Sequence, residues 1–97
     1  PVVHLLIGRI HLASGRTAEA ADELRRALRL DPLAVAARRL LGFALVQLGR
    51  FAEAVEQWEQ WERLAPGDDR EMEQRDEVVA AKAAARLLAG SGARARA

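Results

Sequence analysis

The chain has 97 residues, the size of one small domain. It contains no cysteine, which excludes disulfides and thiolate metal sites. A formal net charge of +1 is too small to indicate a nucleic-acid partner, and no uninterrupted apolar run is long enough to span a bilayer.

Helix-forming residues dominate the composition, and apolar side chains recur at helical spacing along most of the chain. The sequence therefore predicts an all-α protein. Five helices are expected, over residues 2–14, 18–30, 32–48, 52–64 and 69–89.

Capping residues set the expected ends of several helices. Gly15 and Gly49 follow apolar runs and are predicted to end the first and third helices in the left-handed conformation. Thr17 is expected to be the N-cap of the second helix. The dipeptide Asp31-Pro32 predicts the start of the third helix, with Asp31 as the cap and Pro32 at the first helical position.

The sequence also repeats itself with an offset of 34 residues. Gly8 matches Gly42, and further pairs are Gly15 with Gly49, Arg16 with Arg50, Glu19 with Glu53, Ala20 with Ala54 and Pro32 with Pro66. A fixed period of this kind indicates helical hairpins stacked side by side. Gly8 and Gly42 are expected to let the paired helices approach each other closely.

The repeated units resemble tetratricopeptide repeats, in which each unit is a pair of antiparallel helices. The family has characteristic residue types at nine positions of each unit. In the first unit these positions hold His4, Ile7, Gly8, His11, Gly15, Ala20, Leu24, Ala27 and Pro32. In the second unit they hold Arg38, Leu41, Gly42, Leu45, Gly49, Ala54, Trp58, Trp61 and Pro66. The resemblance covers residues 1–67. It departs from the pattern where His4, His11, Arg38 and Leu45 occupy aromatic slots. Trp61 occupies an alanine slot, and the Ala-rich fifth helix is expected to make room for its indole.

The resemblance implies an α-solenoid forming a single domain over residues 1–89. Repeats would occupy residues 1–34 and 35–68, and residues 69–89 would form a capping helix that closes the stack. The Gly-Ser-Gly segment that follows is expected to end this helix, which would leave residues 90–97 as a flexible tail.

The resemblance also implies a non-catalytic module that binds a peptide or a partner helix in a concave groove, lined by the first helix of each pair. The groove face would hold Val2, Leu5, Arg9, Leu12, Ala13, Ala36, Arg39, Phe43, Val46, Gln47, Arg70, Glu73 and Glu77. Phe43 is the candidate anchor, and Arg9 and Arg39 are the candidate charged contacts. The alternative is structural, with Phe43 half-buried and Arg39 paired with Glu73.

The arginines of the first and third helices and of the turns after them have no acidic neighbours there. A protein partner of the groove is therefore expected to be apolar with acidic groups. Some members of the family clamp a C-terminal carboxylate with Lys and Asn. Leu5, Arg9 and Phe43 stand near those positions here, so that clamp is not predicted.

The first helix carries a further apolar face, formed by Val3, Leu6 and Ile10. An exposed apolar face of this kind marks an interface. Three explanations are open: upstream repeats that cover the face, a homodimer that forms through it, and simple exposure. A second self-association surface is conceivable at Trp58 and Trp61, although core packing is the favoured interpretation of both tryptophans.

No catalytic, metal or cofactor site is expected. His4 and His11 lie seven residues apart, about 10 Å along a helix, which is too far for one metal ion. The chain has no phosphate-binding loop, and Arg94 and Arg96 are too few to predict a nucleic-acid partner. The favoured function is a part of a larger scaffold, and a regulatory domain of a larger enzyme is an alternative. The chain begins at Pro1 without Met, so upstream sequence is expected and the compartment stays open, with the cytoplasm as the default.

Overall fold

The computed structural model describes residues 2–64 and 69–96, and within these ranges the side chains of residues 3–64 and 74–90. Over this part of the chain the secondary structure consists of five α-helices. They are α1 Val2–Ala13, α2 Thr17–Leu30, α3 Val35–Gln47, α4 Phe51–Leu64 and α5 Asp69–Arg96. The predicted all-α class is confirmed.

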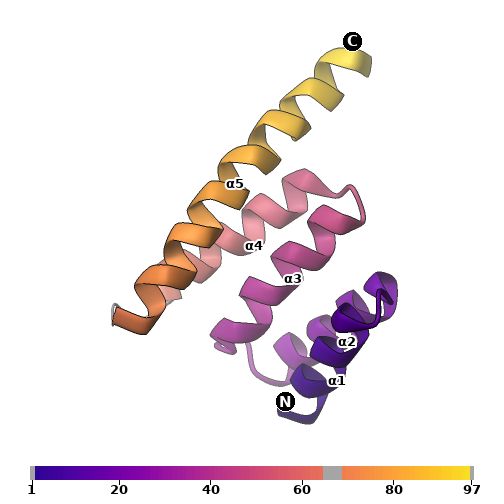
Figure 1. Ribbon diagram of the computed structural model, residues 1–97. Coiled ribbons are helices and arrows are strands. Elements are labelled where there is room, and N and C mark those ends of the chain that lie inside the picture. Colours follow the sequence, from indigo (N-terminus) through magenta and orange to yellow (C-terminus); the bar gives the residue numbers. More distant parts are fainter. Residues whose placement is uncertain (1, 65–68, 97) are drawn as a thin grey trace.

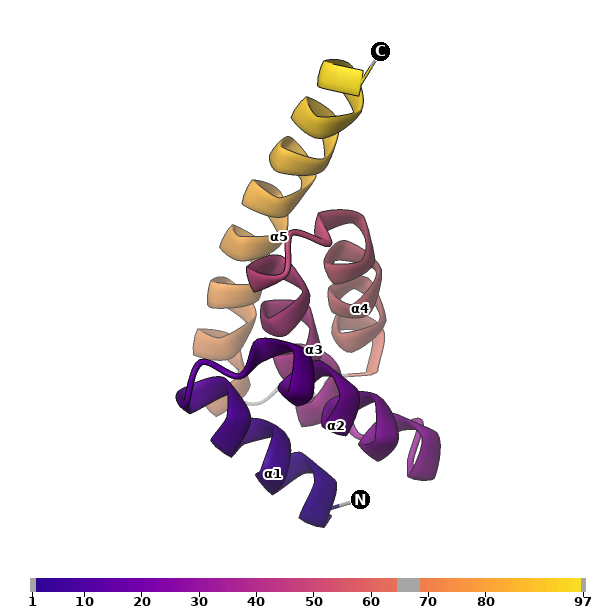
Figure 2. The ribbon, with the colours of Figure 1, turned by 90° about the vertical axis from the view of Figure 1, so that its right-hand side faces the viewer.

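The helices form a stack in which each helix packs on the next one along the chain. α1 and α2 form one antiparallel hairpin and α3 and α4 form another (Figure 1). α2 packs on α3 and so joins the two hairpins, while α5 packs on α4. Figure 2 shows that the C-terminal half of α5 extends beyond the hairpins. This arrangement is the helical-repeat solenoid that the period of the sequence predicts.

The two glycine caps are confirmed and have the same geometry. Gly15 has φ 77° and Gly49 has φ 79°, in the region that only glycine adopts readily. In the first cap the backbone N–H of Arg16 donates to the carbonyl of His11 at 2.8 Å. In the second, Arg50 donates to the carbonyl of Leu45 at 2.8 Å. These are Schellman caps, which end the first helix of each hairpin and turn the chain back.

The starts of two helices differ from the prediction. Thr17 is the first residue of α2 and not its N-cap; its hydroxyl donates to Oε1 of Gln47 at 2.9 Å. α3 begins at Val35 and not at Pro32. Asp31 closes a turn instead, because its Oδ1 accepts from the N–H of Leu33 at 3.0 Å and its carbonyl accepts from the N–H of residue 34 at 3.0 Å. Proline at the second position of such a turn is favoured by its fixed φ.

The expected end of the fifth helix is also wrong. α5 continues from Asp69 to Arg96 through the Gly-Ser-Gly segment that was expected to stop it at residue 89. Glycine ends a helix only where the chain needs a positive φ, and among the described residues Gly15 and Gly49 alone have one. The alanines and arginines around the segment favour helix strongly.

The two unit glycines are contact points between paired helices, as expected. A Cβ on Gly8 would lie 3.0 Å from Cδ2 of Leu24, and a Cβ on Gly42 would lie 2.1 Å from Nε1 of Trp58. The second distance is far below any real contact, so the indole of Trp58 occupies the space of a side chain at position 42. That indole also donates to the backbone carbonyl of Arg39 at 3.1 Å.

The core runs through the whole stack and is densest in the second hairpin. Trp58 and Trp61 are 0% and 1% exposed. They belong to one buried cluster with Leu41 and Leu45 of α3 and Val78 and Ala85 of α5. Ala85 is buried and Ala81 packs against the cluster, so small residues of α5 face α4 and accommodate the large indole of Trp61.

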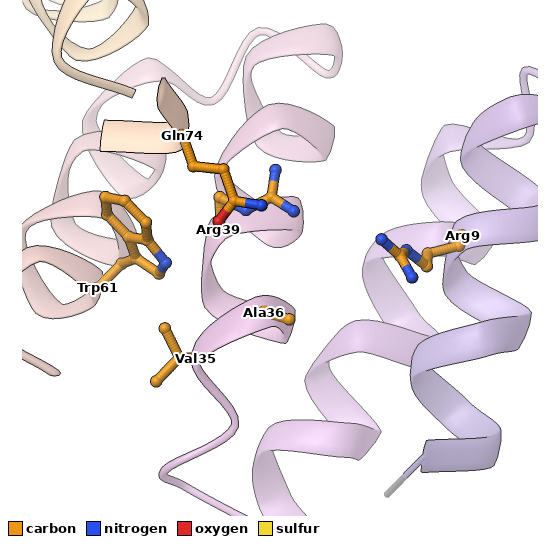
Figure 3. Close-up of a pocket in the computed structure, with 6 residues that line it drawn as sticks. All are labelled: Arg9, Val35, Ala36, Arg39, Trp61 and Gln74. Carbon is orange, nitrogen blue, oxygen red and sulfur yellow. The ribbon is translucent and has the colours of Figure 1, made fainter. Parts of the chain in front are cut away.

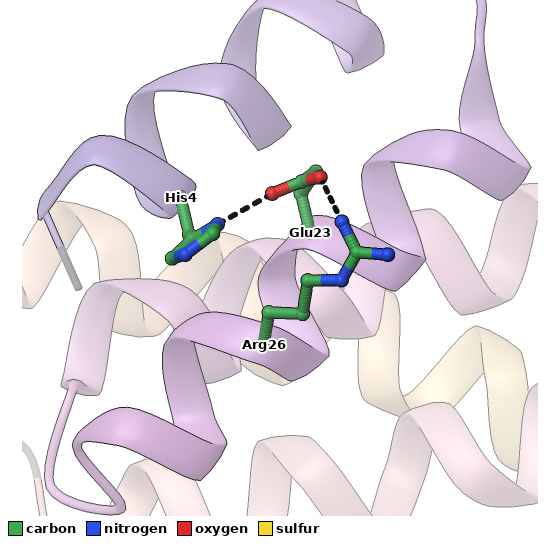
Figure 4. Close-up of polar contacts among 3 residues, drawn as sticks. All are labelled: His4, Glu23 and Arg26. Carbon is green, nitrogen blue, oxygen red and sulfur yellow. Dashed lines mark hydrogen bonds and ion pairs between the residues drawn. The ribbon is translucent and has the colours of Figure 1, made fainter.

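Near the start of each unit, a polar residue stands at the position that is usually aromatic and forms a hydrogen bond to the paired helix. In the first unit Nδ1 of His4 lies 2.7 Å from Oε2 of Glu23, and Arg26 donates to the other oxygen of that carboxylate at 2.6 Å (Figure 4). In the second unit Arg38 donates to Oε1 of Gln57 at 3.2 Å. Both pairs join the two helices of a hairpin at equivalent positions, so hydrogen bonds stand where the family packs an aromatic ring.

The contact between Gly42 and Trp58 gives a prediction for stability. The variant Gly42→Ala is expected to lower the free energy of unfolding by about 3 kcal/mol, because the added methyl displaces a buried indole. Gly90→Ala is the matched control, since a Cβ there meets nothing within 4 Å; it is expected to be stabilising by about 0.5–1 kcal/mol through helix propensity. Urea denaturation measures both, and equal effects of the two variants would contradict the close contact.

The carboxylate of Glu23 gives a prediction for pH. Its pKa is lowered from 4.5, chiefly by the hydrogen bond to His4, with the charge of Arg26 adding to the effect and burial opposing it. A lowered pKa in the folded state adds stability that is present above pH 4.5 and is lost as the pH falls through the folded pKa. The destabilisation caused by Glu23→Gln is therefore expected to be largest near neutral pH and to shrink below pH 4.5.

Denaturation of Glu23→Gln and wild type across this pH range tests the expectation. Glu56→Gln, at an exposed position of α4, is the control and should differ little from wild type at every pH. If Glu23→Gln lowers the free energy of unfolding equally at every pH, the charge of the carboxylate does not contribute to stability.

Candidate functional site

The predicted groove residues lie on α1, α3 and the N-terminal half of α5. Leu5 and Leu12 of α1 and Phe43 and Val46 of α3 are half-buried, and each packs against the core while keeping part of its surface exposed. Arg9, Ala13, Gln47 and Glu77 are exposed, and Ala36 and Arg39 are half-buried. The side chains of Val2, Arg70 and Glu73 lie outside the described residues. These positions form a surface that combines half-buried apolar side chains with exposed polar ones.

A hollow of about 270 Å³ opens in this surface and is lined by residues of α1, α3, α4 and α5 (Figure 3). Its apolar lining consists of Val35 and Ala36 at the start of α3 and Trp61 of α4; its polar lining is Arg9, Arg39 and Gln74. In Figure 3 the guanidinium groups of Arg9 and Arg39 are directed into the space between α1 and α3, and Gln74 extends from α5 toward Arg39. Two of the predicted groove arginines therefore line one hollow.

The electrostatics of the hollow are dominated by its two cations. Burial lowers the pKa of Arg39, the carboxylate of Glu77 opposes this shift, and the charge of Arg9 adds to it. A guanidinium nevertheless stays charged at any physiological pH. Within the described side chains neither Arg9 nor Arg39 takes part in an ion pair. The pairing of Arg39 with Glu73 that the sequence suggested falls on a side chain outside this range.

Two of the predicted groove residues already have contacts within the chain. The ring of Phe43 packs edge-on against Trp58, with ring centroids 5.1 Å apart and an interplanar angle of 67°. Oε1 of Gln47 accepts from the hydroxyl of Thr17. The half-buried state of Phe43 thus agrees with the structural alternative for this residue, while its remaining exposed surface stays accessible to a ligand.

Sequence reasoning missed three residues that line the hollow, namely Val35, Trp61 and Gln74. Trp61 was assigned to the core, where it does lie, but one edge of it also borders the hollow. Gln74 stands one position after Glu73 on α5. No signal in the sequence shows which side of this helix faces Arg39, because that depends on how α5 crosses α3 and α4.

The apolar face of α1 is exposed, as expected. Val3, Leu6 and Ile10 are 65%, 51% and 64% accessible. The equivalent residues of α3 are Ala37, Leu40 and Ala44, and in that helix the two alanines are fully buried and Leu40 is half-buried. The neighbour α2 covers α3 on that side, whereas no helix of the described residues covers α1 in the same way.

The other proposed self-association surface is ruled out by the structure. Trp58 and Trp61 are buried in the core and offer no face for another molecule. Between residues 79 and 87 the exposed side of α5 is mostly apolar, with Val79 and Leu87 48% and 74% exposed and three exposed alanines between them. This stretch of α5 closes the core over α4, whereas terminal helices of such stacks usually have a polar outer face.

Other kinds of chemistry have little support in the described part of the chain. No group of three or more His, Cys, Asp or Glu side chains there could hold a metal ion. None of the helices searched combines the length and the apolar character needed to cross a membrane.

Comparison with known proteins agrees with the internal repeat. The profile of the tetratricopeptide repeat matches residues 5–69, which include the second helical hairpin and all but the first three residues of the first. A comparison with curated proteins gives no match. Repeats of this kind generally mediate contacts between proteins and are typically non-catalytic. The chain therefore belongs to the tetratricopeptide repeat family.

Proposed function

We propose that the protein binds an extended segment of a partner protein along the surface formed by α1, α3 and the N-terminal half of α5. The observation that carries this proposal is the hollow between these helices, which is lined by two arginines together with apolar side chains. In this proposal the chain acts as part of a larger scaffold or assembly protein.

The apolar part of the surface supports a peptide ligand. Leu5 and Leu12 on α1 and Phe43 and Val46 on α3 are held in place by the core beneath them, yet each keeps accessible area. Side chains that are fixed in this way lose little conformational freedom when a ligand covers them, so their burial contributes to affinity.

The charge of the α1 and α3 part of the surface supports an acidic ligand. Neither α1 nor α3 contains an acidic residue, whereas both contribute arginines. A segment that is apolar with acidic groups complements this part, while the exposed Glu77 lies on the α5 part of the surface.

Selection from a random peptide library on the purified chain tests the proposal. The selected peptides are expected to combine apolar residues with Asp or Glu, and to bind Arg39→Glu at least tenfold more weakly than wild type, because the variant reverses a charge of the surface. Arg29→Glu is the matched control, since it makes the same charge change at an exposed position of α2. Selected peptides that bind both variants as well as wild type would contradict the proposal.

Labelling locates the bound peptide independently of these variants. The chain has no cysteine, so a single cysteine at Ala13 of the proposed surface can be compared with one at the exposed Ala52 of α4. A selected peptide that carries a thiol-reactive group should label the first position and not the second. Preferential labelling at Ala52 would place the ligand elsewhere.

The exposed face of α1 favours homo-oligomerisation as a second candidate function. Val3, Leu6 and Ile10 are together more exposed than their equivalents in α3, which a neighbouring helix covers. Upstream repeats would cover the same face. A role as the regulatory domain of a larger enzyme has no particular residue in its favour.

Light scattering coupled to size-exclusion chromatography tests the second candidate. If the face of α1 drives association, the wild-type chain should form dimers, and Leu6→Glu should be monomeric because it places a charge in the centre of the apolar contact. Leu33→Glu is the control, since Leu33 is also exposed, at 68% against 51% for Leu6, but lies in the turn before α3. A monomeric wild-type chain would exclude this mode of association for the chain studied.

A further inference from the structure

The charges around the hollow limit the kind of anion that it can hold. Arg9 and Arg39 contribute two positive charges, and Glu77 acts on Arg39 with the opposite sign. The three groups together leave a single positive charge. A singly charged carboxylate would balance it, whereas a phosphate dianion would leave an excess of negative charge.

The two arginines suit a carboxylate in their placement as well. Arg39 is half-buried, and a charged group that has lost part of its water is stabilised when an anion pairs with it. The planar guanidinium presents parallel N–H groups that match the two oxygens of a carboxylate. Arg9 points toward the same space from the other helix, so an anion between α1 and α3 would lie between the two guanidinium groups (Figure 3).

We infer that this hollow binds the side-chain carboxylate of one Asp or Glu in the interior of the partner segment, with an apolar residue next to it. The inference rests on the proposed function and specifies the ligand chemistry of that site.

An interior position follows from what surrounds the arginines. Leu5 precedes Arg9 by about one helical turn and Leu12 follows it by about one turn. On α3, Ala36 precedes Arg39 and Phe43 follows it. Partly accessible apolar surface thus extends from the hollow in both directions along the helices. A segment that uses all of it passes through the hollow and does not end there.

The apolar neighbour follows from the floor of the hollow. Val35, Ala36 and the edge of Trp61 line the same space as the guanidinium groups. A carboxylate alone would leave the accessible parts of Val35 and Ala36 exposed to water, whereas an adjacent aliphatic side chain would cover them. Gln74 provides an amide at the rim that can donate to the second carboxylate oxygen or to the backbone of the segment.

The test uses a peptide selected on the wild-type chain, acetylated and amidated so that its side chains carry its only charges. Replacement of the critical Asp or Glu by its amide is expected to weaken binding on the order of tenfold, as measured by fluorescence anisotropy. Replacement by Lys should weaken it further. Acidic residues outside the hollow should tolerate the same changes.

A charge exchange separates direct pairing from a loss of folding. Arg9 is exposed, so Arg9→Glu is expected to fold like wild type, which circular dichroism can confirm. This variant should bind the Lys peptide more tightly than the acidic one, the reverse of the wild-type order. Arg29→Glu alters the net charge equally and should keep the wild-type order.

Three results would overturn the inference. The amide peptide could bind as tightly as the acidic one, a peptide truncated to a free C-terminal acid at that position could bind more tightly, or a phosphoserine in place of the acid could bind more tightly. If peptides also label the cysteine at Ala13, these results leave the proposed function standing. If no peptide binds the chain at all, the proposed function and this inference fail together.

Discussion

The packing of Trp58 on Gly42 is the contact on which the rest of the structure depends. The indole lies so close to the backbone of α3 that a side chain at position 42 would occupy the same space. Its Nε1 donates to the carbonyl of Arg39, and its ring packs against that of Phe43 in a T-shaped arrangement. One buried side chain of α4 thus fixes the helix that carries Arg39 and Phe43. The buried contact of Trp58 thus positions the accessible side of α3.

The two hairpins share a backbone plan but differ in how they fill it. Leu24 takes the place in the first hairpin that Trp58 takes in the second, and it lies against Gly8 with a looser fit. Alanines elsewhere in both units keep the paired helices close. The largest buried side chains of the chain, Trp58 and Trp61, both belong to α4. The second hairpin therefore holds the two largest buried side chains, and each hairpin also has a hydrogen-bonded pair between its helices, His4 with Glu23 and Arg38 with Gln57.

Both ends of the stack present apolar surface. At one end the face of α1 around Leu6 is exposed, and at the other end the outer face of α5 between Val79 and Leu87 is exposed. A helical repeat buries one side of each helix against the next helix. An end helix has no neighbour on that side, so its residues there are usually polar. Here they are apolar at both ends. The hollow at Arg39 lies on α1, α3 and α5 between these ends, so the recognition proposed for it does not require either end to be covered.

The helices, their pairing and the contacts that recur with the repeat follow from patterns within the sequence. The spacing of Gly8, Gly15 and their copies predicted both close approaches and both glycine caps, because each depends on backbone geometry that only glycine permits. Tertiary structure decided the features that depend on distant neighbours. Asp31 and Pro32 form a turn rather than a helix start, and α5 runs through the Gly-Ser-Gly segment. An Asp-Pro dipeptide is compatible with either a turn or a helix start, and glycine with either a helix end or a helix interior. The convergence of Arg9, Arg39 and Gln74 depends on how three helices cross, and no local pattern in the sequence encodes that crossing.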